Sequence, residues 1–124
     1  MINFVNLVDG IDKVIHEQKV NACITLLNAY GHKEFFIKVG DTLPCSTELS
    51  EKKALTSYHF RKDNHDIHTV LQGMAPTPLI MGEYCFIPGG KYISLEKGTY
   101  YLGVSSDDPS KDSLLANQIS QYFN

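Results

Sequence analysis

Hydrophobic residues first recur along this chain at the spacing of a helix and then at the spacing of strands. Between residues 3 and 18 the apolar positions are separated by gaps of 3, 1, 3, 3 and 1, which is the helical period. Asn3 stands where a helix N-cap is needed. Two apolar runs follow, 20–29 and 33–40, with Gly31 in the turn between them. This pattern predicts a β-hairpin whose first, continuously apolar strand lies at the centre of a sheet.

The middle of the chain predicts two helices. Residues 48–60 follow a short loop, and Ser46 or Thr47 is the expected N-cap. A second helix is expected from Asn64, which would cap it, through Leu71.

The last part of the chain predicts a loop, three strands and a helix. The two prolines of segment 74–82 favour a surface loop. Asp108 and Pro109 are typical of a helix start. Apolar runs predict strands at 83–88, 91–96 and 99–105, and the final helix is expected to bury Leu114, Leu115, Ile119, Tyr122 and Phe123.

The predicted order is therefore α-β-β-α-α-β-β-β-α. Hairpin-linked strands with helices on both flanks indicate an antiparallel sheet of about five strands in an α+β domain. A length of 124 residues fits a single domain over 1–124, large enough to bury a core.

Composition narrows the classes of function. The formal net charge is −3 and no long basic run occurs, which argues against sequence-independent nucleic-acid binding. No apolar stretch approaches the roughly 20 residues that cross a bilayer. The first ten residues lack the basic region of a signal peptide. We therefore expect no membrane partner and a cytoplasmic location.

The three cysteines, Cys23, Cys45 and Cys85, are odd in number and far apart in the sequence. This spacing is typical of neither a disulfide framework nor a zinc site. Cys23 and Cys85 lie in apolar runs and are expected to be buried. Cys45 lies at a predicted helix start, where the helix dipole favours a thiolate, and is a candidate reactive thiol.

Candidate chemistry gathers on the predicted helix 48–60. Lys53 and Thr56 share its apolar face and His59 borders that face. A purely structural interpretation is that Lys53 snorkels and Thr56 bonds the preceding turn. The alternative is that the three side chains face a ligand.

Two further histidines, His65 and His68, are three residues apart with Asp63 and Asp66 beside them. Such spacing on a helix can hold a metal ion, or can simply make a polar helix face. No third ligand is evident, so no metal ligand is assigned.

The glycines of the segment 86–106 raise a similar choice. Gly89 and Gly90 precede one strand, and Gly103 lies near the end of the next. Glycine is found where another part of the chain, or a ligand, comes close. Either a helix packs tightly on the sheet here, or a pocket opens between Thr56, His59 and the Gly89–Gly90 corner.

Four stretches, taken in order, resemble the GlcG/HbpS family, the "haem-degrading" or DUF336 domain that is also found at the C-terminus of PduO-type proteins. They represent a first hairpin, a central helix with a Lys-Ala-x-Thr motif, a glycine-rich corner, and a strand end followed by an acidic residue of the last helix, here Asp112. Together they cover roughly residues 20–123: ITLLNAYGHKEFF, STELSEKKALTSYHF, IPGGKYI and YYLGVSSDDPSKDSLLANQI.

The resemblance implies a profilin-like or PAS-like fold, homo-oligomers and, in some members, bound haem. Carried onto this chain, it gives the expected cofactor-binding residues as Lys53, Thr56, His59, Gly89 and Gly90. His59, or Thr56 on the family helix, would supply an axial ligand, with His65 and His68 as alternates; ferric haem prefers imidazole to a hydroxyl.

Three functions are compatible with the sequence. The first is a module that binds a small molecule, with haem or another tetrapyrrole as the leading ligand. The second is a non-catalytic assembly protein of a metabolic operon whose partner is itself or another pathway protein. The third is an enzyme using Lys53, His59 or Cys45. No nucleophile is placed beside a base and an orienting carboxylate, so no catalytic residue is assigned.

Overall fold

The computed structural model describes residues 2–123. Within that range it contains four α-helices, six strands and one short 3₁₀ helix. In chain order these are α1 (Phe4–Gln18), β1 (Ala22–Leu27), β2 (Lys33–Val39), α2 (Pro44–Phe60), α3 (Asn64–Met74), β3 (Ile80–Met81), β4 (Tyr84–Cys85), β5 (Gly90–Leu95), β6 (Gly98–Ser106), η1 (Pro109–Lys111) and α4 (Asp112–Ser120). The predicted α+β class is confirmed.

The main sheet has the strand order β2-β1-β6-β5, and every neighbouring pair is antiparallel. Strand β1 lies between β2 and β6, and all six of its residues are buried. A strand buried on both faces has no need to alternate apolar and polar residues, which explains its continuous apolar run. The central position predicted for this strand is confirmed.

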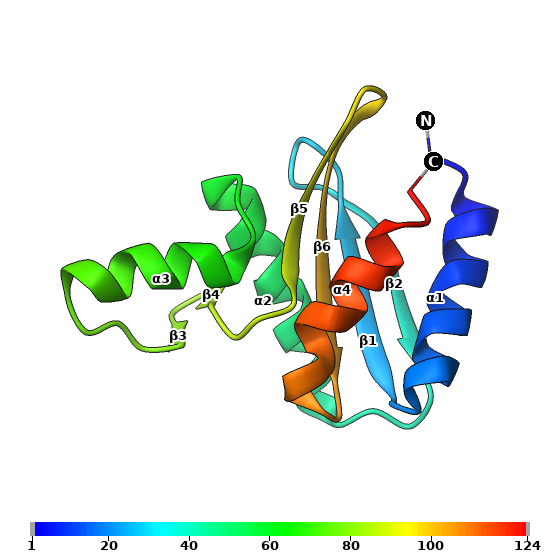
Figure 1. Ribbon diagram of the computed structural model, residues 1–124, viewed down its shortest axis with the longest axis horizontal. Coiled ribbons are helices and arrows are strands. Elements are labelled where there is room, and N and C mark those ends of the chain that lie inside the picture. The colour runs from blue at the N-terminus through cyan, green and yellow to red at the C-terminus, as the bar shows by residue number, and fades with distance from the viewer. Residues whose placement is uncertain (1, 124) are drawn as a thin grey trace.

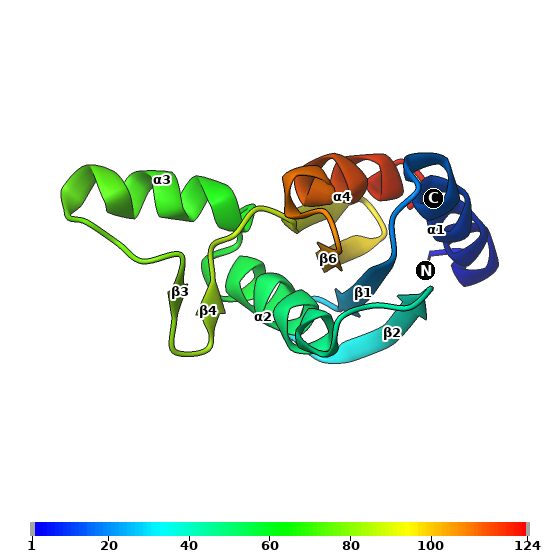
Figure 2. The same cartoon turned by 90° about the horizontal axis from the view of Figure 1, so that it is seen from below.

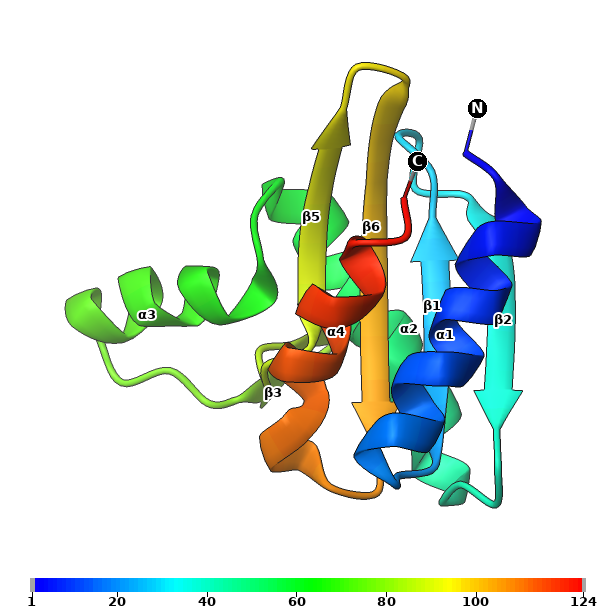
Figure 3. The same cartoon turned by 45° about the vertical axis from the view of Figure 1, so that its right-hand side comes forward.

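Helices cover both faces of the main sheet. Figure 3 shows α1 and α4 side by side on one face, and Figure 2 shows α2 on the opposite face. The larger apolar core lies on the α1 and α4 side. Its largest fully buried members are Leu7, Ile11, Ile15, Ile24, Leu26, Leu102, Val104, Leu115 and Ile119.

The expected strand 83–88 differs most from the structure. Only Tyr84–Cys85 is extended, and it pairs with Ile80–Met81 in a separate two-stranded sheet. The main sheet therefore has four strands rather than about five, and segment 74–82 is not entirely a loop. The side chain of Asn64 donates to the Cys85 and Ile87 carbonyls, so this backbone bonds to a helix residue instead of a sheet neighbour.

Three helix starts also differ from expectation. Helix α2 begins at Pro44, before the expected N-cap at Ser46 or Thr47. Proline is pre-organised for the first helical position, which explains the earlier start. The N-cap of α3 is Asp63, one residue before the expected Asn64. The turn from Pro109 forms η1 before α4 begins.

The final helix buries most, but not all, of its expected stripe. Leu115 and Ile119 of α4 are buried four residues apart, whereas Phe123, which is buried, and Tyr122, which is half-buried, follow the end of the helix at Ser120. Leu114 instead exposes 45% of its surface, because it lies one residue off that stripe.

An arm made of α3, β3 and β4, residues 64–85, projects from the body of the domain (Figures 1 and 2). It is joined to the body through α2 and the start of β5. Within residues 2–123, no helix combines the length and the apolar character needed to cross a bilayer.

Candidate functional site

Helix α2 packs on the main sheet through small and polar residues rather than large apolar ones. Ser50 forms a 2.8 Å hydroxyl–hydroxyl bond with Thr25 of β1. A Cβ atom placed on Gly103 of β6 would collide with the Ser50 carbonyl and lie 2.7 Å from the Ala54 nitrogen. Small residues on both sides let the helix backbone approach the sheet closely. The buried residues of this face are Ser46, Ser50, Lys53, Ala54, Thr56 and Ser57.

Lys53 is enclosed at the centre of this contact, with 1% of its surface exposed. Its Nζ donates to Asp112 Oδ2 of α4 at 2.6 Å and to the Val104 carbonyl of β6 at 2.9 Å. The other Asp112 oxygen accepts from the backbone N–H and the hydroxyl of Ser106. Lys53 therefore joins α2, β6 and α4 through charge-assisted bonds.

Burial raises the pKa of the Asp112 carboxyl, while the Lys53 ammonium and the Ser106 donors act in the opposite direction. Two charges taken out of water are compatible with folding only when they are paired and hydrogen-bonded. This arrangement provides both. The pair thus links α2 to the first residue of α4 beside the end of β6.

Gly89 and Gly90 lie against α2, and the atoms that approach them closely belong to the protein. Gly89 has φ +133°, and a Cβ there would lie 2.5 Å from the Val104 carbonyl and 3.1 Å from Lys53 Nζ. A Cβ on Gly90 would lie 2.5 Å from the Lys53 carbonyl. In the structure the close neighbours are therefore protein atoms of α2 and β6, and ligand contact by either glycine stays a prediction.

Thr56 lies one turn beyond Lys53 and is also buried. Its hydroxyl donates to the Lys52 carbonyl at 2.7 Å and accepts from the Cys85 N–H at 2.9 Å. It thus holds β4 against α2 with both hydrogen-bonding roles engaged. Thr56, Lys53, Gly89 and Gly90 are brought together along one buried seam, and an axial-ligand role for Thr56 remains only a prediction.

His59 is the expected site residue that the structure places on the surface, at the C-terminal end of α2. Its Nδ1 lies 2.9 Å from the Tyr84 hydroxyl. The rings of Tyr58 and Tyr84 each pack edge-on against the imidazole, with centroids 5.4 Å away. The imidazole is therefore held by partners from both α2 and β4.

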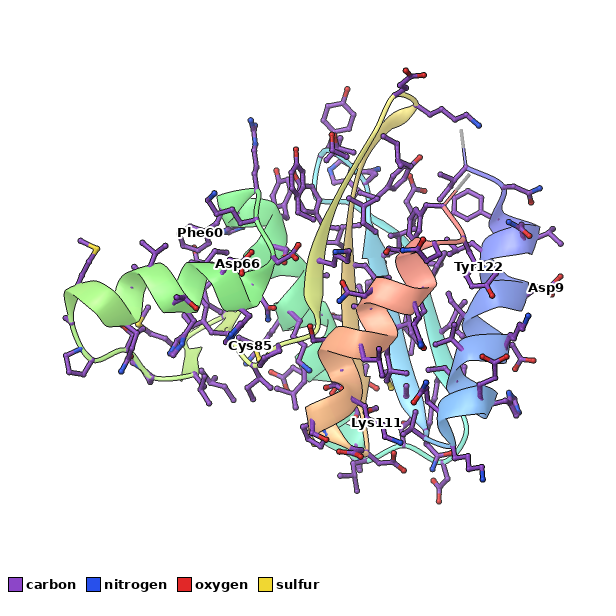
Figure 4. All side chains as sticks on the ribbon, viewed as in Figure 1. Asp9, Phe60, Asp66, Cys85, Lys111 and Tyr122 are labelled. Atoms are coloured by element: carbon purple, nitrogen blue, oxygen red, sulfur yellow. The ribbon has the colours of Figure 1, made fainter. Side chains whose placement is uncertain are left out.

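A surface hollow of about 330 Å³ opens beside His59. Aromatic rings and one cation surround it. Figure 4 shows Phe60 where α2 ends beside the arm. Arg61, the next residue, is the C-cap of α2 and is exposed. The residues that line this hollow, which we call the His59 hollow, are Ala29, Tyr58, His59, Phe60, Arg61 and Tyr84.

The two histidines of α3 are placed apart from the His59 hollow. His68 Nε2 lies 2.9 Å from the Thr77 carbonyl and its ring packs on Phe86, so it holds the arm's loop. His65 is exposed. No three His, Cys, Asp or Glu side chains gather closely enough to hold a metal ion in the part of the chain that the structure describes.

The cysteines follow the expectation from their positions. Cys23 and Cys85 are buried, and burial raises the pKa of the Cys85 thiol. Cys45 is exposed at the start of α2. It is about 20 Å from His59 by the rise of the helix, so these two groups are not brought together for catalysis.

Sequence reasoning missed the roles of Asn64, Tyr84 and Arg61. Asn64 was expected only as a helix cap, yet it is fully buried and also accepts from the Gly90 N–H. Tyr84 is 25 residues from His59 in sequence and meets it only through β4. For Arg61 the sequence does offer one indication, since it is a cationic residue directly after the aromatic residues that end the predicted helix 48–60.

The structure defines a class: a single α+β domain with a four-stranded antiparallel sheet between helical layers and a surface hollow containing a histidine. The family model described as "Haem degrading protein HbpS-like" matches residues 5–120. The chain belongs to this HbpS-like family, which confirms the resemblance of its motifs.

Solved structures show the same fold at low sequence identity. A crystal structure of a PduOC–haem complex superposes with a TM-score of 0.85 at 21% identity, covering 98% of this chain and 91% of that one. The Klebsiella pneumoniae protein ORFY of DUF336 gives 0.83 at 18%, covering 97% and 86%. A double mutant of Streptomyces reticuli HbpS gives 0.80 at 14%, covering 97% and 83%. No curated protein matches by sequence.

Proposed function

We propose that this chain is a non-catalytic binding protein for haem or a related tetrapyrrole, held at the His59 hollow with His59 as the iron ligand. Membership of the HbpS-like family and the fold shared with a PduOC–haem complex support this class of ligand. The observation that carries the proposal is the 2.9 Å bond between His59 Nδ1 and Tyr84 at the edge of an aromatic hollow.

The His59–Tyr84 bond suits metal ligation. When Nδ1–H donates to the Tyr84 oxygen, Nε2 carries the lone pair that can bind iron. Ligating histidines ordinarily have their second nitrogen fixed by such a partner, which sets the tautomer and the orientation of the ring. Haem iron bound there would accept Nε2 of His59 as a ligand, and the role of Tyr84 would be to orient the imidazole.

The rest of the hollow has the chemistry that a tetrapyrrole needs. Tyr58, Phe60 and Tyr84 offer aromatic surface for a planar macrocycle. Arg61 can pair with a propionate carboxylate in bidentate fashion. A hollow of about 330 Å³ is at the small end for ligand sites, so the far face of a macrocycle would stay open on a single chain. A second copy could cover it, consistent with a homo-oligomer.

A hemin titration followed by absorbance tests this proposal. Wild-type protein should give a saturable Soret shift at one hemin per chain, and His59→Ala should lose it. His65→Ala is the matched control, because that histidine is exposed outside the hollow, and it should behave as wild type. A response that never saturates, or an unchanged titration of His59→Ala, would contradict the proposal. Loss in Tyr84→Phe but not in His59→Ala would instead assign the iron to tyrosine.

A second function, a non-catalytic assembly protein that binds copies of itself, is favoured by the arm. Met74 exposes 80% of its surface there, and several apolar neighbours are also exposed. Such a concentration is typical of an interaction surface. The exposed apolar residues of the arm and of the adjoining end of α2 are Phe60, Val70, Met74, Leu79, Ile80 and Met81.

Light scattering tests this second function. Val70→Glu with Met74→Glu should reduce the mass of the oligomer. Val5→Glu is the matched control, because Val5 is equally exposed but lies on α1, away from the arm. A monomeric wild-type protein, or an oligomer unchanged by the arm substitutions, would exclude assembly through this surface.

A further inference from the structure

A second cavity lies at the opposite end of α2 from the His59 hollow. Its volume is about 200 Å³, and it is bounded by the start of α2, the end of β6 and the turn that leads into α4. Cys45 and His59 stand at the two ends of the helix, so the two sites are separated by about 20 Å of helical rise. We call this the α2 N-terminal cavity.

Most of the wall of the α2 N-terminal cavity is apolar. The large apolar residues of this wall are Leu43, Leu49, Ile87 and Pro109. An apolar cavity of about 150 Å³ is large enough to hold benzene, so this one can accept a molecule with a single ring or a short chain.

The charged groups that line the cavity already have hydrogen-bond partners within the protein. Lys53 is bonded to Asp112 and to the Val104 carbonyl. Asp112 also accepts from Ser106, and Asp107 accepts from the backbone and side chain of Asn21. An anionic ligand would lose its hydration without meeting an unpaired cation, and a cationic ligand would find only the exposed, solvated carboxylate of Asp107, so a neutral molecule is favoured.

Two buried hydroxyl groups in the lining have no internal partner. Ser46 is 2% exposed and Ser105 is 3% exposed, and no hydrogen bond within residues 2–123 engages either side chain. Neither oxygen is fully sealed, since Ser57 carries the one completely enclosed unpartnered hydroxyl among the described residues. Each hydroxyl therefore keeps free hydrogen-bonding capacity in the lining of the cavity, and both are suited to bond an oxygen atom held there.

We propose that the α2 N-terminal cavity binds a small neutral molecule with a hydroxyl or carbonyl oxygen on a compact apolar body. The oxygen would bond Ser46 and Ser105, and the apolar body would contact Leu49 and Ile87. This site is independent of the His59 hollow, so the two proposals can fail separately.

Three probes of one shape and different charge test the proposal: cyclohexanol, cyclohexanecarboxylate and cyclohexylammonium. Cys45 lies at the cavity and is the exposed cysteine, whereas Cys23 and Cys85 are buried. The rate at which a thiol reagent modifies Cys45 therefore reports occupancy. Cyclohexanol should slow this reaction saturably and shift the amide NMR signals of Ser46 and Ser105. The two charged probes should bind at least about tenfold more weakly.

Serine substitutions distinguish a built site from a simple apolar gap. Ser46→Ala with Ser105→Ala should weaken cyclohexanol binding by about tenfold, the value of one or two hydrogen bonds. The same variant should keep its melting temperature and its hemin titration, because neither hydroxyl has a partner in the protein. Ser94→Ala, an exposed serine on β5, is the matched control. Equal binding of the three probes, or unchanged binding by the double variant, would overturn the proposal, as would no saturable effect at all.

Discussion

Replacing Asp112 by asparagine should remove a large share of the domain's stability, because the change leaves the Lys53 ammonium buried without an anionic partner. Asparagine has nearly the same shape, and its Oδ1 can still accept from the Ser106 N–H and hydroxyl. In that orientation the amide Nδ2, a donor, replaces the carboxylate oxygen that lies 2.6 Å from Lys53 Nζ, so the variant loses both the negative charge and the acceptor opposite the ammonium.

The expected magnitude follows from the burial of both side chains, each 1% exposed. Removing one partner of a buried ion pair costs about 3–5 kcal/mol, against a total unfolding free energy of about 5–15 kcal/mol for a typical domain. An unfolding entropy of about 2.1 cal/mol/K per residue gives about 0.26 kcal/mol/K for this chain. The melting temperature should then fall by about 12–19 °C.

Urea unfolding followed by circular dichroism measures this cost directly. Lys53→Met combined with Asp112→Asn removes both charges, so the double variant should cost less than the sum of the single variants. Glu51→Gln is the matched control, because it breaks a 2.9 Å pair with Lys33 whose side chains are nearly half exposed, and it should cost under about 1 kcal/mol. An Asp112→Asn cost as small as that of Glu51→Gln would refute the reasoning.

Three other outcomes follow from the packing around α2. Gly103→Ala should destabilise the domain by about 1–3 kcal/mol or more in the same urea assay, because its Cβ meets the backbone of α2; an unchanged midpoint would contradict this contact. Asn64→Ala should lower the free energy of unfolding by about 2–4 kcal/mol, because it leaves the Cys85 and Ile87 carbonyls and the Gly90 N–H without their hydrogen-bond partner. Hydrogen exchange should show the arm opening first, and amide protection of the arm equal to that in wild type would contradict this role of Asn64. Burial raises the pKa of Tyr101 above the ordinary 10.0, so the folded state holds this proton more tightly and stability should fall as the pH rises above 10.0. Tyr101→Phe should flatten that fall, and an identical pH profile for the two proteins would exclude the effect.

Much of the fold is predictable because its signals are local. The helical period of α1, the continuous apolar run of β1 and the hairpin turn before β2 each lie within a few residues. The expected strand 83–88 fails for a non-local reason. Its backbone carbonyls bond the side chain of Asn64, about twenty residues earlier, and no local pattern reveals that partner.

The candidate site likewise has features that the sequence reveals locally and features that depend on residues distant in the chain. A lysine on an otherwise buried helix face is visible in the sequence, but its role depends on Asp112, which is 59 residues away. Resemblance to a family drew attention to Lys53, Thr56 and the glycine corner, and the structure places all of these in a buried packing seam. Of the expected cofactor-binding residues, only His59 lines the His59 hollow, because it lies near the end of α2, where the helix meets Tyr84 from β4.

The most direct test of the central claim is imidazole rescue of a His59→Gly variant. Hemin mixed with this variant should lack the Soret band of the wild-type complex, and adding imidazole should restore that band saturably, because the free base can occupy the space left by the side chain. His65→Gly should already give the wild-type band without imidazole. A His59→Gly complex that matches wild type from the start, or one whose response to imidazole equals that of hemin alone, would contradict ligation by His59.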